Sequence, residues 1–275
     1  MTAVGEIARG AATPTVLPVW ERQLLDATTI PPHASHVPLP MGTRIPHTNL
    51  VQRSFFFTSK HISALKNKLP PHLRTSTAFD VLAAFFWRSC TAALLIDPDD
   101  EVRFVCAATI RSRSKSYLPL GFYGNAIVFP LAQTKAGDLR RKSLSYAVEL
   151  VKKTKSSVTH GSLRSMIGRG SPFAGIGMHH KYFVSDLTRA KFRQVDFGWG
   201  RAAYGGLPYG SDSTTPAVAS FYVSYTNRKG EEGVVVPLSL PRLAMERVVK
   251  EVERVSDAPL EKPHKILSAT IRSAL

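Results

Sequence analysis

The chain has 275 residues, of which 44% are hydrophobic and 20% are charged, and its formal net charge is +16. This composition is typical of a folded globular protein and excludes a disordered or collagen-like chain. The positive charge favours anionic partners such as nucleic acid, an anionic membrane or a phosphate-bearing small molecule. The basic residues are scattered, and no aromatic-rich recognition motif accompanies them, so we expect no nucleic-acid partner.

The most apolar stretch of the sequence runs from Val81 to Ile96 and carries Arg88 in its middle. It is short for a membrane span, so we expect a buried helix and no membrane partner. Cys90 and Cys106 form neither a disulfide framework nor a zinc spacing, and we interpret both as reduced core thiols of an intracellular protein. The start lacks the pattern of a signal peptide, and the end, "SAL", resembles a peroxisomal address without its basic residue. We therefore expect a cytoplasmic protein.

The first half of the chain suggests two bodies joined by a loop. Residues 30–55 begin with a segment that holds five prolines and three histidines and shows no hydrophobic periodicity. This pattern predicts an extended crossover loop. The histidines are better explained as polar loop residues than as metal ligands, because no compact ligand cluster accompanies them.

After the loop we expect a strand end followed by a helix that begins near Ser59. Thr77 and Asp80 then form the pattern of a capping box in front of the buried helix.

Strands and helices alternate in the second half. Strands are expected at 102–110 and 124–132, and an amphipathic helix at 138–158. Residues 218–240 predict a β-hairpin, and the closing helix has Pro241 near its first turn. This alternation indicates a mixed α/β fold.

The sequence contains no common local catalytic signature. The sequence has no GxSxG motif, no Walker loop and no dinucleotide fingerprint. His179 and His180 are adjacent, and adjacent strand residues point to opposite faces, so a structural role is favoured for both. The acidic run from Asp97 to Asp100 contains Pro98 and is typical of a solvated turn.

One block resembles a known family. "DFGWG", Asp196 to Gly200, is similar to one of the two signatures of the plant acyl-CoA-dependent acyltransferases called BAHD enzymes. Supporting resemblance comes from "STAFDVLAAFFWRSCTAAL", "ATIRSRSKSYLPLGFYGNAIVFP", "YFVSDLTRAKF" and "VASFYVSYTNRKGEEGVVVPLSLP". Within the family, the chain looks nearest to the branch of benzyl alcohol O-benzoyltransferases and methanol O-anthraniloyltransferases.

The resemblance implies a two-lobe enzyme of mixed-sheet, chloramphenicol-acetyltransferase-like α/β lobes. Residues 1–29 would be a remnant of the N-terminal lobe, 30–55 the crossover loop and 56–275 the C-terminal lobe. Residues 196–221 would pack toward the N-terminal lobe, most of which would be missing. The implied reaction transfers an acyl group, expected to be aromatic, from acyl-CoA to a small alcohol. Acyl-CoA is then a co-substrate, no bound cofactor or metal is expected, and the protein would be a monomer.

The second signature of the family, HxxxD, does not occur in this sequence. None of the nine histidines has an aspartate four positions later. In the family, that histidine is the general base which deprotonates the acceptor, and such assistance contributes roughly 10²–10⁴-fold. We therefore assign no catalytic residue and expect a truncated chain with weak or no activity. The alternative is a non-catalytic remnant that binds CoA or a protein partner.

The remaining site residues are carried over from the family pattern. The block forms a structural corner in which Asp196 would pair with an arginine of "IRSR", for which we favour Arg111. Gly198 and Gly200 would allow close backbone approach. Trp199 would pack near the reacting end of the substrate channel. The corner comprises Asp196, Phe197, Gly198, Trp199 and Gly200, with Arg111 as its partner.

A second group of residues would lie near the CoA entrance. Tyr123, Gly124 and Asn125 match the family's turn at that place, and basic residues of the second half would meet the CoA phosphates. Thr109 departs from the pattern, since the family usually has asparagine there.

Overall fold

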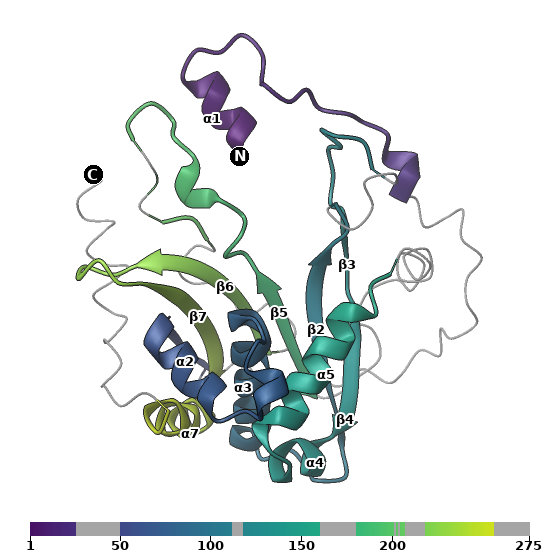
Figure 1. Ribbon diagram of the computed structural model, residues 1–275, viewed down its shortest axis with the longest axis vertical. Coiled ribbons are helices and arrows are strands. Elements are labelled where there is room, and N and C mark those ends of the chain that lie inside the picture. The colour runs from purple at the N-terminus through teal and green to yellow at the C-terminus, as the bar shows by residue number, and fades with distance from the viewer. Residues whose placement is uncertain are drawn as a thin grey trace.

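The computed structural model describes residues 1–25, 50–111, 118–159, 180–200, 202, 204–206 and 218–255. Its centre is a mixed seven-stranded sheet with the order β1-β7-β6-β5-β2-β3, in which β4 also pairs with β2 (Figure 1). Pairs β2–β5 and β5–β6 are parallel and the other pairs are antiparallel. The strands are β1 (Leu50–Thr58), β2 (Glu101–Thr109), β3 (Ile127–Val128), β4 (Leu131–Lys135), β5 (Lys181–Asp186), β6 (Val218–Thr226) and β7 (Glu232–Pro241).

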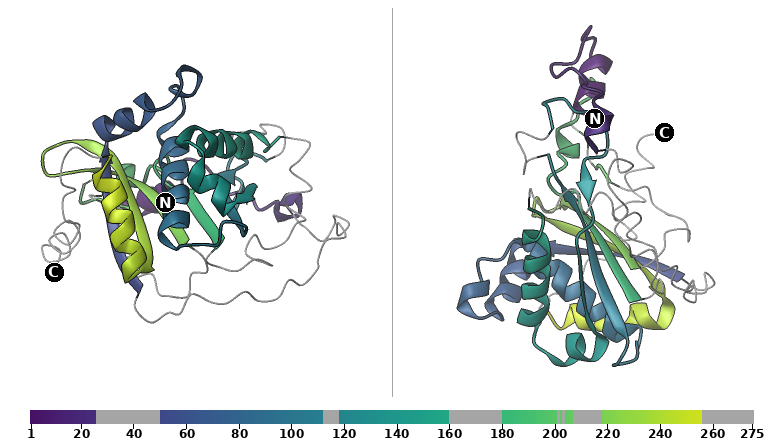
Figure 2. Two further views of the ribbon diagram at one scale, coloured as in Figure 1. Left: turned by 90° about the horizontal axis from the view of Figure 1, so that it is seen from below. Right: turned by 90° about the vertical axis from the view of Figure 1, so that its right-hand side faces the viewer.

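Helices cover one face of this sheet (Figure 2). They are α2 (Ser59–Asn67), α3 (Ala78–Ala93), α4 (Ala136–Arg141), α5 (Leu144–Ser156) and α7 (Arg242–Glu253). Strand residues alternate between faces, and on β2 the side chains of Val102, Phe104 and Cys106 join the core beneath the helices. Among the described residues, no helix combines the length and the apolar character that a membrane crossing would need.

Helix α3 is the centre of the core, as the sequence predicted. Phe86 and Trp87 are almost fully buried, as are most of the residues around them. The helix begins with the predicted capping box: Thr77 Oγ1 accepts from the amide of Asp80, and the Asp80 carboxylate accepts from the amide of Thr77. Because this motif uses only contacts three residues apart, the sequence alone specifies it.

Three predicted boundaries differ in the structure. The helix expected at 138–158 is split into α4 and α5, because Lys142 and Ser143 both adopt extended backbone angles. The strand expected at 124–132 is split into β3 and β4 on either side of Phe129 and Pro130; Pro130 has no amide to donate. Helix α2 is capped by Thr58, whose box is closed by His61, and not by Ser59.

The expected crossover loop at 30–55 overlaps the sheet. Residues 50–55 belong to β1, which pairs with β7 from Leu50 to Thr58, so the sheet includes the last six residues of the expected loop. Residues 30–49 lie outside the described part of the chain.

The N-terminal segment extends beyond the end of the sheet that is remote from α7 (Figure 1). It contains α1 (Thr2–Ala8) and the 3-10 turn η1 (Arg22–Leu25). Two further 3-10 turns are η3 (Pro71–Leu73) and η5 (Phe192–Gln194). Leu24 and Leu25 pack on a second small core, which is formed by Ile110, Leu118, Phe122, Ala126, Val128 and Val158.

Candidate functional site

The aspartate of the DFGWG block organises its own turn. Its Oδ1 accepts hydrogen bonds from the amide of Gly198 at 2.7 Å and from the amide of Gly200 at 3.1 Å. Both glycines have positive φ angles, +109° and +106°, which other residues rarely adopt. The amide of Ala202 donates to the carbonyl of Val195 and closes the loop. Asp196 thus anchors a tight corner through its side chain.

The two glycines serve this corner through backbone conformation and not through close approach. Within the described part of the chain, a Cβ built on Gly200 would have no heavy atom within 4 Å, and one on Gly198 would have only Cγ of Arg9, at 3.9 Å. This differs from the expectation that their lack of a side chain lets another backbone approach.

Helix α1 packs directly against the corner. The Arg9 guanidinium donates to the backbone carbonyl of Asp196, and a Cβ on Gly5 would lie 2.8 Å from that same oxygen. Gly5 therefore permits a close approach that other residues would block. The N-terminal segment and the DFGWG corner are far apart in sequence but adjacent in space (Figure 1).

Trp199 lies on the surface of this corner. Its side chain is 94% exposed, whereas Phe197 is half-buried. The expected packing of Trp199 near a reacting centre is therefore not found among the described residues. Of the segment 196–221, residues 201, 203 and 207–217 lie outside the described part of the chain.

Arg111 belongs to a different corner, at the end of β2. Its Nη1 donates to the carbonyl of Phe122 at 2.7 Å, its Nη2 donates to the carbonyl of Gly124, and its guanidinium lies 5.7 Å from the ring centre of Phe122. The amide of Arg111 donates to Oγ1 of Thr109, so threonine takes part where the family usually has asparagine. Arg111 thus fixes the turn that carries Tyr123 to Asn125.

The predicted ion pair between Asp196 and Arg111 is not formed in the structure. The guanidinium of Arg111 is engaged by two carbonyl groups on its own side, and Asp196 is engaged by its own turn. Each group finds partners nearby in the sequence: the Asp196 carboxylate accepts from amides two and four residues away, and the Arg111 guanidinium donates to carbonyls eleven and thirteen residues away. Arg113, the other arginine of "IRSR", lies outside the described residues.

The predicted CoA-entrance turn is exposed and is held by the N-terminal segment. The amide of Tyr123 donates to the carbonyl of Val19 at 2.8 Å, and the rings of Trp20 and Tyr123 lie 4.5 Å apart at 49°. Gly124 and Asn125 are also exposed. The Arg22 guanidinium lies 5.3 Å from the Trp20 ring centre, so a cation and two exposed aromatic rings share this corner.

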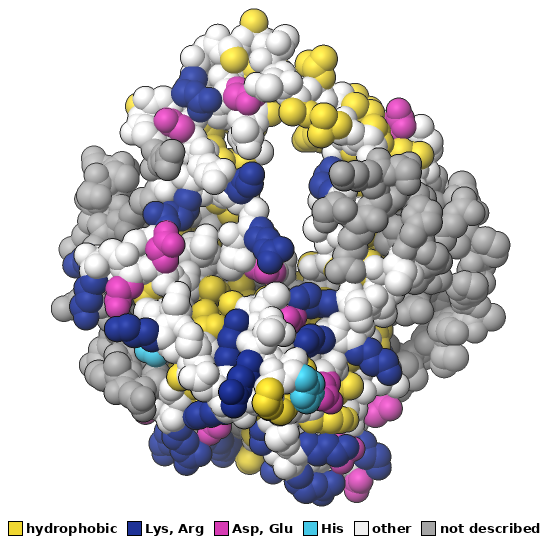
Figure 3. Space-filling model, viewed as in Figure 1, with side chains coloured by type: hydrophobic (Ala, Val, Ile, Leu, Met, Phe, Trp, Pro, Cys, Tyr) yellow, Lys and Arg dark blue, Asp and Glu magenta, His cyan; other side chains and the backbone are white. Residues whose placement is uncertain are grey.

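The space-filling view shows an opening between the N-terminal segment and the body of the protein (Figure 3). The DFGWG corner borders one side of the N-terminal arch and the Tyr123 turn meets its other end (Figure 1). The structure thus brings both predicted groups of site residues to the same end of the sheet, although it does not join them directly.

Sequence reasoning missed a buried lysine that lies beside an arginine on the sheet. Lys181 on β5 is 2% exposed and is the register partner of Arg103 on β2. Burial lowers the pKa of Lys181, and the Arg103 charge lowers it further. Both residues lie on the face opposite the helices, because their neighbours Phe104 and Tyr182 enter the core. No spacing in the sequence indicates this pair, because it arises only when β2 and β5 align.

Of the adjacent histidines His179 and His180, the structure describes only His180. His180 precedes β5 and lies 3.4 Å from a carboxylate oxygen of Asp100, whereas His179 lies outside the described residues. In the described part of the chain, no group of three or more His, Cys, Asp or Glu side chains could hold a metal ion.

Comparisons with known proteins give one consistent result. A family model described as "Transferase family" matches residues 1–255. The chain is 47% identical over 274 residues to a benzyl alcohol O-benzoyltransferase of Petunia hybrida, covering 95% of this chain and 59% of that protein. It is 46% identical over 288 residues to the same kind of enzyme from Nicotiana tabacum, covering 100% of this chain and 61% of that protein. The chain therefore spans about three-fifths of the length of these relatives.

Solved structures resemble the chain in fold. Vinorine synthase matches with a TM-score of 0.65 at 20% identity, over 92% of this chain and 57% of that chain. The TRI101 protein of F. graminearum, in complex with coenzyme A and deoxynivalenol, matches with a TM-score of 0.59 at 18% identity, over 91% of this chain and 58% of that chain. These likenesses confirm the expected mixed α/β fold.

Proposed function

We propose an acyl-transfer function for this chain, which belongs to the Transferase family of BAHD acyltransferases. The donor would be an acyl-CoA with an aromatic acyl group, and the acceptor would be a small alcohol. The observation that carries this proposal is the 47% identity to a benzyl alcohol O-benzoyltransferase over 95% of the chain.

The proposed reaction requires a base for the acceptor hydroxyl. The hydroxyl oxygen attacks the thioester carbonyl carbon, a C–O bond forms, the C–S bond breaks, and the hydroxyl proton passes through the base to the departing CoA sulfur. In the family this base is the histidine of HxxxD, which the 275 residues do not contain. We therefore propose that the chain by itself turns over slowly, by about 10²–10⁴-fold relative to a family member that carries the motif.

The exposed turn from Tyr123 to Asn125 is the proposed contact for CoA. Trp20 and Tyr123 offer two exposed aromatic rings against which the adenine base could stack, and such stacking is tolerant of the base's identity. Arg22 supplies a cation beside them for a phosphate group. Arg111 would be a positioning residue, since its guanidinium holds the carbonyls of Phe122 and Gly124.

A second candidate function is non-catalytic binding of CoA or of a protein partner. The absence of HxxxD from the sequence favours it, because the proposed CoA contact does not depend on that histidine. The two candidates share the binding step and differ in whether any ester is formed.

Ester formation separates the two candidates. The chain would be incubated with benzoyl-CoA and benzyl alcohol, and benzyl benzoate would be quantified by mass spectrometry against an enzyme-free reaction. Ester above that background, and less of it in the Tyr123→Ala variant, supports acyl transfer. No ester together with saturable CoA binding supports the second candidate, and neither ester nor CoA binding contradicts both.

A further inference from the structure

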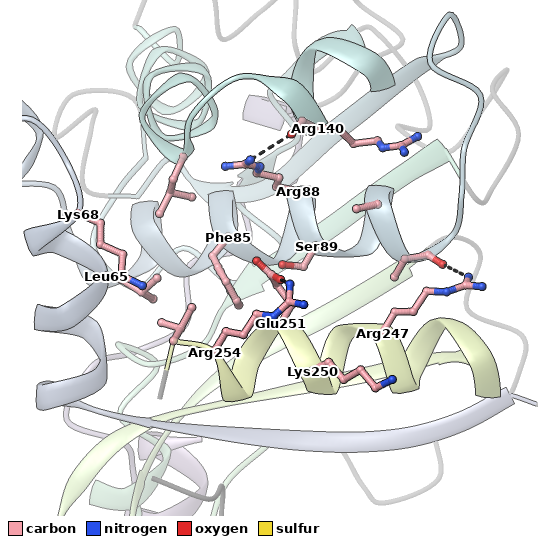
Figure 4. A pocket seen from close by; sticks show the side chains of 14 residues that line it. Leu65, Lys68, Phe85, Arg88, Ser89, Arg140, Arg247, Lys250, Glu251 and Arg254 are labelled. Atoms are coloured by element: carbon pink, nitrogen blue, oxygen red, sulfur yellow. Dashed lines mark hydrogen bonds and ion pairs between the residues drawn. The ribbon is translucent and has the colours of Figure 1, made fainter. Parts of the chain in front are cut away.

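A basic pocket lies on the helix side of the sheet, away from the two corners described above. It has a volume of about 470 Å³, is partly open to solvent, and is lined by residues of α2, α3, α7, α4 and the start of α5 (Figure 4). Leu65, Phe85 and Leu144 supply apolar wall, and Ser89 adds a hydroxyl. The volume falls in the range of sites that bind small molecules.

Positive charge dominates the lining of this pocket. Six of its side chains are cationic and one, Glu251, is acidic; the cations are Lys68, Arg88, Arg140, Arg247, Lys250 and Arg254. The close-up view shows that they come from four separate parts of the chain, with the side chains of Arg140 and Arg247 directed toward the C-terminal end of α3 (Figure 4). Lys and Arg side chains also gather over the helices in the space-filling view (Figure 3). Gathering like charges costs free energy unless an anion offsets their repulsion.

Part of this charge has a structural explanation. Arg247 donates to the carbonyl of Ala93 at 2.8 Å, and Arg140 donates to the carbonyl of Ile96 at 3.2 Å, so both satisfy carbonyls at and just beyond the C-terminal end of α3. Arg88 donates to the carbonyl of Arg140. Each guanidinium has five N–H donors, so these single contacts leave most donors available to a ligand.

The two lysines have no such explanation. Arg254 is paired with Glu251 at 3.1 Å, but within the described ranges the side-chain ammonium groups of Lys68 and Lys250 make no hydrogen bond and no ion pair. Both are exposed at the pocket. The lysines therefore add positive charge to the pocket without serving the fold.

We propose that this pocket binds a small molecule that carries a phosphate group and an apolar portion. The arginines would donate to the phosphate oxygens, the lysines would add charge, and the apolar wall formed by Leu65, Phe85 and Leu144 would take the rest of the ligand. The pocket is separate from the proposed CoA contact, which lies at the other end of the sheet (Figure 1). The inference does not depend on the acyl-transfer function.

The test uses isothermal titration calorimetry on the whole chain, with 1-naphthyl phosphate and inorganic phosphate as probes. The salt concentration is about 0.1 M, at which charges are screened beyond about 10 Å. The test variant is Lys68→Gln/Lys250→Gln. The matched control is Lys60→Gln/Lys153→Gln, which removes the same charge from two exposed lysines that do not line the pocket. Circular dichroism would verify that both variants are folded as the parent is.

We expect saturable one-to-one binding of 1-naphthyl phosphate, and weaker binding of inorganic phosphate because it lacks the apolar portion. The test variant should weaken binding by about tenfold or more, because two favourable charge interactions are lost, and the control by less than about twofold. No saturable binding of either phosphate, or equal weakening in both variants, would overturn the proposal. Vesicles of phosphatidylglycerol and phosphatidylcholine provide a further arm: binding to them without binding of 1-naphthyl phosphate would overturn the small-molecule assignment.

Discussion

The carboxylate of Asp196 accepts a hydrogen bond from the amide of Gly198 at 2.7 Å, two residues further along the chain. A second bond, from the amide of Gly200, makes this side chain the organiser of the whole DFGWG turn. The conformation depends on an acceptor oxygen at this position and on glycine at two positions with positive φ angles. An architectural role for the motif follows from these local contacts alone.

Two substitutions of Asp196 distinguish the effect of its hydrogen-bond acceptor oxygen from the effect of its negative charge. Asp196→Ala removes both acceptor bonds and should lower the free energy of unfolding by about 1 kcal/mol, because water replaces bonds that are exposed. Asp196→Asn retains an oxygen acceptor and should recover most of that loss. Urea unfolding measures both variants. Equal destabilisation by asparagine and alanine would mean that the negative charge, and not the turn, is what matters.

A double-mutant cycle tests the absence of the Asp196–Arg111 ion pair. The structure predicts a coupling free energy below about 0.5 kcal/mol between Asp196→Asn and Arg111→Gln, because the Asp196 carboxylate accepts from the amides of Gly198 and Gly200 whereas Arg111 donates to the carbonyls of a different turn. Urea unfolding of the two single variants and the double variant supplies the cycle. A coupling well above that value would restore the pairing that the family resemblance implied.

Tryptophan fluorescence tests the exposure of the corner. The three tryptophans differ sharply, since Trp199 is 94% exposed, Trp20 is 56% exposed and Trp87 is 1% exposed. Iodide should therefore quench much of the tryptophan fluorescence of the parent protein. Trp199→Phe should remove much of the fluorescence that iodide can quench. Trp20→Phe serves as the comparison. An unchanged quenchable fraction in Trp199→Phe would contradict an exposed Trp199.

The sequence predicted features that depend on local chemistry. The capping box of Thr77 and Asp80 and the hairpin of β6 and β7 use contacts between near neighbours, so their patterns are visible in the residues themselves. The break between β3 and β4 at Pro130 could have been anticipated, because proline cannot donate to a ladder.

Other features could not be read from the sequence, because they depend on distant segments meeting in space. The Arg103–Lys181 pair requires the register of β2 and β5, which are far apart in the sequence. The basic pocket requires four segments to converge. Arg111 was identified as a site residue, but its bonds to the carbonyls of Phe122 and Gly124 could not be anticipated, since nothing in the motif shows that nearby carbonyls satisfy its donors.

An ion pair between a buried aspartate and a partly exposed lysine joins α3 to α5, and it offers a test of the core. Nζ of Lys155 lies 2.6 Å from Oδ1 of Asp80, whose side chain is 4% exposed. Lys155→Met should lower the free energy of unfolding by about 2–3 kcal/mol, because the buried aspartate loses its countercharge. The loss is smaller than for a fully buried pair, because Lys155 is partly exposed. Lys153→Met, on the exposed side of α5, should change it by less than about 0.5 kcal/mol. Equal effects in urea unfolding would argue against a stabilising pair.

Two buried tyrosines predict a loss of stability at alkaline pH. The hydroxyls of Tyr182 and Tyr222 lie 2.9 Å apart in the core, and burial raises the pKa of both well above the ordinary value. Unfolded tyrosines lose protons near pH 10, about their unperturbed pKa, while these folded ones keep them, so unfolding is favoured increasingly above that pH.

The contribution of this pair can be isolated by comparing slopes. Urea unfolding between about pH 9 and pH 11 should show a shallower fall of stability in Tyr222→Phe than in the parent, since one group with a raised pKa is gone. Tyr225→Phe, which changes a partly exposed ring on the same strand, is the matched control. The same slope in Tyr222→Phe and in the parent would rule out this source of the pH dependence.

Binding of CoA is the step on which both candidate functions depend, and calorimetric titration of the chain with CoA tests it most directly. We predict saturable one-to-one binding that Tyr123→Ala weakens by about threefold to tenfold, through loss of a stacking surface. Lys68→Gln/Lys250→Gln should weaken CoA binding less than Tyr123→Ala does, because those lysines lie on the helix side of the sheet, away from the Tyr123 turn. No saturable binding, or weakening by the lysine variant and not by Tyr123→Ala, would contradict the placement of CoA at the Tyr123 turn.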